Sequence, residues 1–217
     1  MYVQANGIKL YYEKTGEGRP LVMVHGNGED HGIFDTAIGL LKEKYTCYAV
    51  DSRCHGKSDK TPELHYQDMA DDMIAFMEAL ELEDVIFYGF SDGGIIGLIA
   101  AAKCPRITTL IVSGANLTPD GVKWSLKLLV KVLNYCKPDP MYALMLNEPH
   151  ISDEMLGSIK AKTLVLAGSG DLVKEKETRH IAETIPGAAL HILKGERHGS
   201  YIVHNEKIAR LIMDFAM

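Results

Sequence analysis

The fold of this chain is decided in the stretch VIFYGFSDGGIIGLIAAAKCP, which runs from Val85 to Pro105. Its first six residues are β-branched or aromatic apart from one glycine, and such a run predicts a buried strand. A lone serine then stands between glycines, and an apolar helical pattern over 93–103 ends before the proline. The rest of the sequence explains why a serine occupies the point where a strand becomes a helix.

The residues Gly89-Phe90-Ser91-Asp92-Gly93 have the form G-x-S-x-G, and their place between a strand and a helix is that of a nucleophile elbow. In such a turn the serine has a strained backbone, and the positions two before and two after it must be small because strand and helix approach closely. Ser91 is then expected at the carboxyl edge of a sheet, at the positive end of a helix dipole. The alternative is a serine that caps the helix after a flexible glycine.

Strand-like and helix-like segments alternate outward from this turn. The expected strands are 2–5, 8–13, 21–26, 46–50, 85–90, 107–114, 162–168 and 189–193, and the expected helices are 33–43, 66–80, 93–103, 174–184 and 201–215. The Asn6-Gly7 pair between the first two strands favours a tight hairpin turn. Apolar strands separated by amphipathic helices predict an α/β fold: one domain over 1–217, with a mostly parallel sheet and helices on both faces.

The alternation breaks between 115 and 159, where the chain is helical or irregular. Apolar residues recur there at helical spacing, and lysines four residues apart form a second face that is most simply a solvated one: Trp124, Leu128, Leu129, Val132 and Leu133, with Lys123, Lys127 and Lys131. An apolar insertion between two sheet strands predicts a short helical lid, in which Trp124 is a candidate for substrate binding. An extra helical packing layer is the alternative.

A serine hydroxyl becomes a nucleophile at neutral pH when a base takes its proton and an acid orients that base. Asp171 follows the expected strand 162–168, and His198 follows the expected strand 189–193, so both should lie at the carboxyl edge near Ser91. The order Ser91, Asp171, His198 is the chain order of the α/β-hydrolase triad. We therefore predict these three as the catalytic residues.

Three other residues compete for the same roles. His191 and His204 are alternative bases, but the first falls inside an expected strand and the second inside an expected helix. Asp120, in the insertion, is the alternative acid. A fourth residue, His25, is not counted among these rivals, because its position at the end of an early strand suits a structural hydrogen bond better than proton transfer.

An oxyanion intermediate needs hydrogen-bond donors beside the nucleophile. The backbone N–H of Asp92, directly after Ser91, is one predicted donor. The early loop after the strand 21–26 should supply the other, and we predict the N–H of Asn27, with Gly28 as the fallback and as a substrate-binding position. Glycines in this loop allow backbone to approach a ligand closely.

The carboxylate of Asp92 is unusual beside a developing negative charge. It is either turned aside to cap its own helix, or it pairs with a cationic group on the substrate, such as the amine of an amino-acid ester. We carry the second reading as a hypothesis and include Asp92 among the substrate-binding candidates.

The residues quoted above, together with HG-x-G at His25–Gly28, DSRCHGKSD at Asp51–Asp59, LVLAGSGD ending at Asp171 and RHG around His198, resemble the α/β-hydrolase superfamily along nearly the whole chain. The elbow is similar to that of the biphenyl hydrolase-like, or valacyclovir hydrolase-type, serine hydrolases. The resemblance implies acyl transfer to Ser91 and hydrolysis of the acyl-enzyme, with a small carboxylic ester, thioester or activated amide as substrate.

Two features depart from the family pattern. Cys54 stands where the DSRCHGKSD loop usually has glycine, and its thiol is either packing or, with a lowered pKa, reactive. The insertion is also shorter than a full cap domain, which predicts a more open pocket.

Composition limits the class of partner. The 217 residues are 47% hydrophobic and 24% charged, with a net charge of −6, which argues against nucleic acid as a partner. The four cysteines have no paired spacing, the N-terminus lacks the form of a signal peptide, and no apolar run is long enough to cross a bilayer. We expect a cytoplasmic protein that uses no metal and no cofactor and has neither membrane nor nucleic-acid partners; its oligomeric state stays open.

Two other functions use the same residues. A cofactor-free perhydrolase has the same triad and transfers the acyl group to peroxide. A catalytically silent ligand sensor on the same fold binds a small molecule and recruits a partner as its lid moves. The intact set of triad residues favours the serine hydrolase over the ligand sensor, and a comparison of acyl transfer to water and to peroxide separates it from the perhydrolase.

Overall fold

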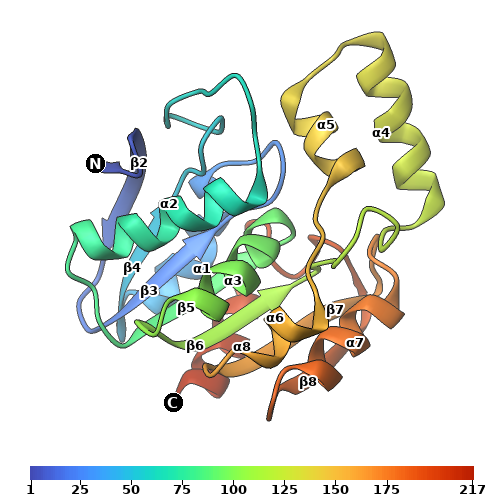
Figure 1. Cartoon of the computed structure of the whole chain (residues 1–217). Helices are drawn as coiled ribbons and strands as arrows, with labels where there is room; N and C mark the ends of the chain where they lie inside the picture. The colour runs from blue at the N-terminus through green and yellow to red at the C-terminus, as the bar shows by residue number, and fades with distance from the viewer.

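The computed structural model describes residues 1–217 and has one eight-stranded sheet with the order β1-β2-β4-β3-β5-β6-β7-β8. The strands are β1 (Tyr2–Ala5), β2 (Ile8–Thr15), β3 (Arg19–Val24), β4 (Tyr45–Val50), β5 (Val85–Phe90), β6 (Ile107–Ser113), β7 (Lys162–Gly170) and β8 (Ala189–Arg197). β2 pairs antiparallel with β1 and with β4, and the other pairings are parallel. The structure thus confirms the mostly parallel sheet (Figure 1).

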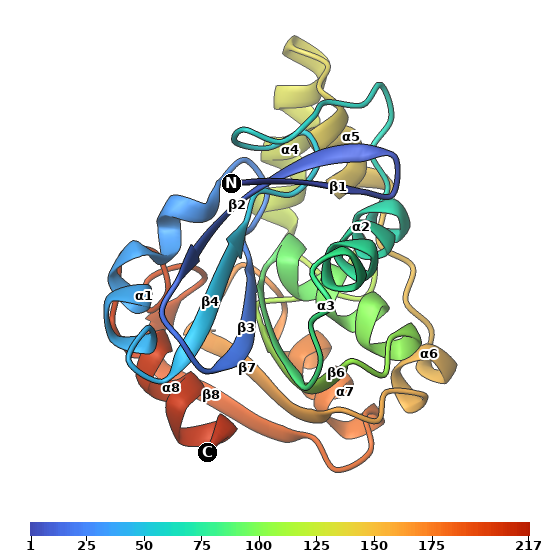
Figure 2. The same cartoon turned by 90° about the vertical axis from the view of Figure 1, so that its left-hand side faces the viewer.

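Helices cover both faces of this sheet, as Figure 2 shows. They are η1 (His31–Phe34), α1 (Asp35–Leu41), α2 (Tyr66–Ala79), α3 (Asp92–Lys103), α4 (Trp124–Cys136), α5 (Pro140–Asn147), α6 (Asp153–Gly157), α7 (Glu175–Thr184) and α8 (Lys207–Ala216). In β3, Val22 and Val24 pack into the apolar layer formed with α2, α3, α6 and α7. Leu21 and Met23 point the other way, into the layer with α1 and α8. The central strands are apolar on both sides because each side faces a helical layer.

The β1–β2 hairpin turns where the sequence predicts it. Asn6 and Gly7 have φ values of +48° and +78°, and the ladder closes with Ala5 opposite Ile8. Asparagine and glycine tolerate this left-handed conformation, which gives the turn the twist that the two strands need.

The insertion 115–159 contains α4, α5 and α6. In Figure 1, α4 and α5 project beyond the carboxyl edge of the sheet, whereas α6 lies against the body of the molecule. Leu156 of α6 and Leu144 of α5 are buried in the same apolar layer as α3. The segment therefore combines both expected arrangements, with α6 as an added packing element and α4 as an outer element above the sheet edge.

Two predicted helices differ from the structure. The helix expected over 33–43 is a short 3₁₀ turn followed by α1, because Asp30 accepts a hydrogen bond from the Gly32 N–H and fixes a tight turn first. The helix expected over 201–215 begins only at Lys207. Residues 201–204 form turns, and His204 has a φ of +49° that a helix interior does not permit.

None of the helices combines the length and the apolar character that crossing a membrane requires.

Candidate active site

Ser91, Asp171 and His198 come together at the carboxyl edge of the sheet, following β5, β7 and β8. The Nε2 atom of His198 lies 3.0 Å from Ser91 Oγ, and its Nδ1 atom lies 2.6 Å from Asp171 Oδ1. Asp171 is buried, with 3% of its side chain exposed, whereas His198 keeps 19% exposed. The histidine therefore bridges an inaccessible carboxylate and a hydroxyl that can meet a ligand.

The surroundings of Asp171 favour its charged form. Burial alone would raise the pKa of this carboxyl, but hydrogen bonding and charge attraction from His198 outweigh it, and the pKa is lowered. The backbone N–H groups of Val173 and Gly168 donate to its two oxygens at 3.0 and 3.3 Å. An ionised Asp171 holds the His198 Nδ1 proton and leaves Nε2 free to accept the proton of Ser91.

The backbone at Ser91 has the form of a nucleophile elbow. Its φ and ψ are 53° and −114°, values that L-residues rarely adopt. A Cβ on Gly89 would collide with the Gly93 carbonyl, and one on Gly93 would collide with the Val24 carbonyl. Ser91 occupies the N-cap position of α3, but its hydroxyl makes no capping hydrogen bond. The simple helix-cap alternative therefore does not describe this residue.

The early loop lies against the start of α3. The Gly93 N–H donates to the His25 carbonyl at 3.0 Å, which brings Asn27 next to the elbow. The Asn27 N–H donates to no protein acceptor, and Asp92, as the first residue of α3, has no acceptor within the helix. Neither of these two N–H groups is therefore used in a hydrogen bond within the protein.

His25 has the structural role that its position suggested. Its Nδ1 atom lies 2.8 Å from the Gly26 carbonyl, and the Ser52 N–H donates to its Nε2 atom at 3.1 Å, so the proton belongs on Nδ1. Burial, together with the nearby His55, lowers the pKa of His25 to about 4. A neutral His25 therefore ties the loop that carries Asn27 to the loop after β4.

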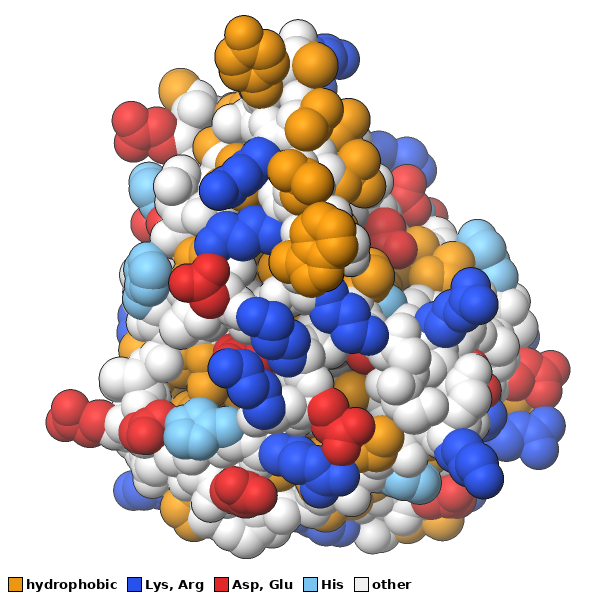
Figure 3. Space-filling view, turned by 90° about the vertical axis from the view of Figure 1, so that its right-hand side faces the viewer, with side chains coloured by type: hydrophobic (Ala, Val, Ile, Leu, Met, Phe, Trp, Pro, Cys, Tyr) orange, Lys and Arg blue, Asp and Glu red, His pale blue; other side chains and the backbone are white.

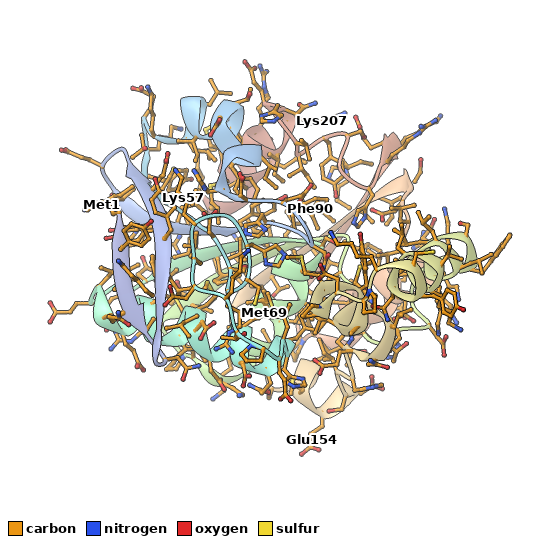
Figure 4. All side chains as sticks on the ribbon, turned by 90° about the horizontal axis from the view of Figure 1, so that it is seen from above. Met1, Lys57, Met69, Phe90, Glu154 and Lys207 are labelled. Atoms are coloured by element: carbon orange, nitrogen blue, oxygen red, sulfur yellow. The ribbon has the colours of Figure 1, made fainter.

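A cavity of about 280 Å³ opens onto Ser91 and His198. Its apolar wall comes largely from the helices of the insertion, through residues such as Leu126, Leu129, Val130, Leu133, Tyr142 and Met145. Phe90, labelled near the middle of Figure 4, also lines it, and its ring lies 4.9 Å from the His198 ring, centroid to centroid. The α4–α5 segment thus bounds the space in which a ligand would meet the serine.

Two predicted substrate-binding residues lie outside this cavity. Trp124 is 76% exposed and points away, because α4 turns Leu126 and Leu129 inward instead. Gly28 is exposed, with a φ of +74°, and the neighbouring Gly26 and Asn27 line the cavity. Helical spacing identified the apolar residues of α4 but not which side of the helix faces the cavity.

The side chain of Asp92 faces the cavity instead of capping its helix. Its Oδ1 accepts a hydrogen bond from the Tyr66 hydroxyl at 2.8 Å, and its Oδ2 accepts one from the Asn27 side-chain amide at 2.9 Å. Burial raises the pKa of Asp92 even though both hydrogen bonds favour its charged form. Tyr66 was not predicted, since nothing near His65 and Tyr66 in the sequence marks the start of α2 as part of a site.

Two further carboxyl groups at the cavity were also missed. Glu29 accepts a hydrogen bond from the Gly26 N–H at 3.0 Å, and burial raises its pKa. Glu148 accepts from the Tyr66 N–H at 3.1 Å and pairs with His65 Nδ1 at 2.6 Å, a contact that raises the pKa of His65. The unpaired carboxyl groups of the lining are therefore Glu29 and Asp92. The single cationic residue of the lining is Lys127, which is already paired with Asp120. The cavity is therefore acidic, which only the convergence of separate loops could reveal.

The rival catalytic residues lie elsewhere. His191 is exposed on β8, and His204 lies in a turn where its N–H donates to the Ile33 carbonyl. Asp120 is exposed and forms an ion pair with Lys127. None of the three lines the cavity.

One group of possible metal ligands occurs away from the cavity. Asp30, His31 and Asp51 place one ligand atom each within 4.8 Å of one another. The hydrogen bond of 2.7 Å between His31 Nδ1 and Asp51 Oδ1 accounts for the closeness of two of them.

Cys54 has a φ of +66°, the left-handed conformation that explains the family's usual glycine at this position. Its sulfur accepts a hydrogen bond from the Thr61 N–H at 3.3 Å and is buried. The thiol packs within its own loop and does not line the cavity.

Comparison with known proteins places this geometry in a family. A family model described as alpha/beta hydrolase fold matches residues 19–136. Serine hydrolase BPHL of Mus musculus is 28% identical over 246 residues, covering 98% of this chain and 84% of that protein. The AB hydrolase superfamily protein YisY of Bacillus subtilis is 27% identical over 259 residues, covering 96% of each.

Solved structures share the fold at lower identity. A meta-cleavage product hydrolase from Pseudomonas fluorescens IP01 superposes with a TM-score of 0.84 at 22% identity, covering 100% of this chain and 97% of its own. A thermophilic esterase from Thermogutta terrifontis gives 0.84 at 21% identity, covering 100% and 98%. The relatives named as serine hydrolases support hydrolase activity. The chain belongs to the α/β-hydrolase fold family and resembles its biphenyl hydrolase-like members.

Proposed function

We propose that this protein is a serine hydrolase that cleaves a small carboxylic ester, thioester or activated amide through an acyl-enzyme on Ser91. The observation that carries the proposal is the continuous chain of hydrogen bonds from Asp171 through His198 to Ser91 at the floor of the cavity. A hydroxyl 3.0 Å from an imidazole nitrogen can lose its proton as it attacks a carbonyl carbon.

Each residue has a defined role in the reaction. Ser91 Oγ attacks the carbonyl carbon while His198 Nε2 takes its proton, and Asp171 stabilises the imidazolium that forms. The leaving group departs with that proton. His198 then takes a proton from the water that attacks the acyl-enzyme and passes it to Ser91 Oγ as the acyl–oxygen bond breaks and the carboxylic acid is released. We assign stabilisation of the oxyanion in both steps to the N–H groups of Asn27 and of Asp92, the first residue of α3.

The acidic lining supports a substrate that carries positive charge. Glu29, Asp92 and Glu148 line the cavity, and Asp92 is held in place by Tyr66 and Asn27 rather than by a cation. A carboxylate fixed in this way, with no neutralising partner, attracts an ammonium group such as that of an amino-acid ester.

Replacing Asp92 by Asn tests this preference. We expect the ratio of kcat/KM for an amino-acid ester over a matched neutral ester to fall about 10-fold or more, because one charge-assisted hydrogen bond is lost. The control is the same ratio in Asp214→Asn, which removes an exposed carboxylate of α8 outside the cavity. An unchanged ratio in Asp92→Asn would remove the support for a cationic substrate.

The hydrolase assignment is tested by intact-protein mass after brief exposure to a fluorophosphonate. We expect one adduct on the unmodified protein and none on Ser91→Ala or His198→Ala. The control for His198→Ala is His191→Ala, which removes an exposed histidine outside the cavity and should still carry one adduct. Ser91→Ala should also lower kcat by about four to six orders of magnitude. Labelling that survives in Ser91→Ala would contradict the assignment.

Two outcomes favour other functions. The absence of any adduct on the unmodified protein would favour the silent ligand sensor. Acyl transfer to peroxide that greatly exceeds transfer to water would favour the perhydrolase.

A further inference from the structure

The outer face of α4 is a stripe of exposed apolar side chains. Trp124, Leu128, Val132 and Tyr135 follow one another at steps of four, four and three residues, which places them on one side of the helix. Their exposed fractions are 76%, 52%, 50% and 89%. Figure 3 shows hydrophobic side chains gathered on the upper part of the face that α4 presents. We call these four residues the α4 outer stripe.

The cavity does not explain this stripe. The opposite side of α4, with Leu126, Leu129, Val130 and Leu133, lines the cavity and accounts for the apolar residues there. None of the four residues of the outer stripe lines it. The helix is thus apolar on two sides, and the second side faces outward, at the part of the molecule that projects farthest from the sheet in Figure 1.

The charges along α4 are positive, and acidic residues stand only at the two ends of its segment, at Asp120 and Asp139. The segment 121–138 contains Lys123, Lys127, Lys131 and Lys137 and no acidic residue, whereas the whole chain has a net charge of −6. Lys127 is paired with Asp120, and the other three form no ion pair. Figure 3 shows Lys and Arg side chains bordering the hydrophobic ones on this face, with Asp and Glu side chains also nearby. Positive charge is therefore concentrated next to the exposed apolar stripe of an otherwise acidic protein.

We propose that the α4 outer stripe binds the surface of an anionic phospholipid bilayer. A helix with aromatic and aliphatic residues on one face and lysines along its flank is the type that lies in the membrane interface, with its apolar side in the headgroup region. The lysines add attraction to anionic headgroups, which decays within a Debye length of the surface. The expectation of no membrane partner rested on the lack of a spanning segment, and a helix that lies on the surface does not need one.

Charge also argues against a second copy of this chain as the occupant. Two α4 outer stripes packed face to face would bring two sets of lysines together with no acidic residue in either segment. Like charges brought together at an interface oppose association. An anionic bilayer satisfies both features of the helix, its apolar stripe and its positive flank.

The sequence supplies a direct probe of this contact. Trp124 is the only tryptophan, and it lies in the stripe itself, so its fluorescence reports the polarity around the outer face of α4. We expect its emission to shift to shorter wavelength on addition of vesicles of phosphatidylcholine with phosphatidylserine. The protein should sediment with these vesicles, less so as salt is raised, and far less with vesicles of phosphatidylcholine alone.

Two variants separate the apolar and the charged contributions. Leu128→Gln with Val132→Gln should abolish sedimentation with the vesicles, because it removes the aliphatic part of the stripe. Lys123→Gln, Lys131→Gln and Lys137→Gln combined should weaken binding on the order of 100-fold. The matched control, Lys42→Gln, Lys160→Gln and Lys194→Gln, makes the same change of charge at exposed lysines elsewhere and should bind as the unmodified protein does.

All of these positions are exposed, and none lines the cavity, so the variants should remain folded and the test does not depend on the proposed hydrolysis. No shift and no sedimentation with the phosphatidylserine vesicles would overturn the proposal, and so would equal weakening by the two lysine variants. A dimer found by analytical ultracentrifugation without vesicles, and abolished by Leu128→Gln with Val132→Gln, would assign the stripe to a second copy instead.

Discussion

Ser91 combines a chemical role with a strained backbone. Its φ of 53° and ψ of −114° cost a residue with a Cβ about 1–3 kcal/mol, a strain that glycine does not have. The surrounding contacts maintain the conformation, since Ser91 N–H donates to the Ser113 carbonyl at 2.8 Å and Gly93 is pinned to His25. The position of the hydroxyl is therefore obtained at the expense of stability.

This strain predicts an order of stability for two variants that both lack the hydroxyl. Ser91→Gly should have a free energy of unfolding about 1 kcal/mol higher than Ser91→Ala, because relief of strain exceeds the added entropy of an unfolded glycine. Urea unfolding of the two proteins measures the difference. Equal stability, or a more stable Ser91→Ala, would show that the elbow is not strained.

At the scale of elements, a buried ion pair joins the loop after β4 to α2. Arg53 donates to both oxygens of Asp72, at 2.6 Å each, and Asn6 donates to Asp72 Oδ1 at 3.0 Å. The side chains of Arg53 and Asp72 are 7% and 0% exposed. A two-pronged pair of this kind fixes the loop, the helix and the β1–β2 turn relative to one another.

The preceding residue of α2, Asp71, provides a matched comparison. Asp71 pairs with Lys103 at 3.0 Å, but both side chains are about 40% exposed. Asp72→Ala should lower the free energy of unfolding by about 3 kcal/mol, because it leaves the buried Arg53 with only the half-exposed Asp68, at 3.2 Å, as a charged partner. Asp71→Ala should lower it by less than about 1 kcal/mol. Chemical denaturation of both variants measures the contrast, and similar losses would contradict it.

At the scale of the whole molecule, His25 links stability to pH. Burial holds its pKa at about 4 in the folded protein, against 6.5 for an ordinary histidine. Below pH 6.5 the unfolded chain takes up a proton that the folded protein does not, so this contribution to stability falls as the pH falls from 6.5 to 4. The total loss reaches about 3 kcal/mol, since each pKa unit corresponds to about 1.4 kcal/mol.

His25→Gln isolates this contribution, because glutamine does not titrate. The difference in free energy of unfolding between the unmodified protein and His25→Gln should shrink by up to about 3 kcal/mol between pH 7 and pH 4. Buried acids such as Asp92 and Glu29, whose pKa values are raised, act in the opposite sense but are common to both proteins and cancel in the difference. A difference that stays constant with pH would mean that His25 has the same pKa in the folded and unfolded states.

Local patterns in the sequence predicted the elements that depend on neighbouring residues. Apolar runs identified each strand, helical spacing identified α2, α3 and α7, and the Asn6-Gly7 pair identified its turn. The predicted helix boundaries were wrong where a long-range contact determines the backbone conformation. One example is His204, whose N–H donates to the carbonyl of Ile33, far away in the chain. A periodic pattern records which face of an element is apolar, but not where a distant segment ends it.

The sequence by itself determined the class of fold, the serine at the turn after β5, and the order of the residues that follow later strands. This was possible because the carboxyl ends of parallel strands lie at the same edge of a sheet, so the residues that directly follow these strands come close together. Only the tertiary structure decided the 3.0 Å approach of His198 to Ser91, the part of Tyr66 and Glu29 in the cavity, and the outward side of α4. These depend on how helices and loops pack across the sheet edge, and packing is a property of segments far apart in the chain.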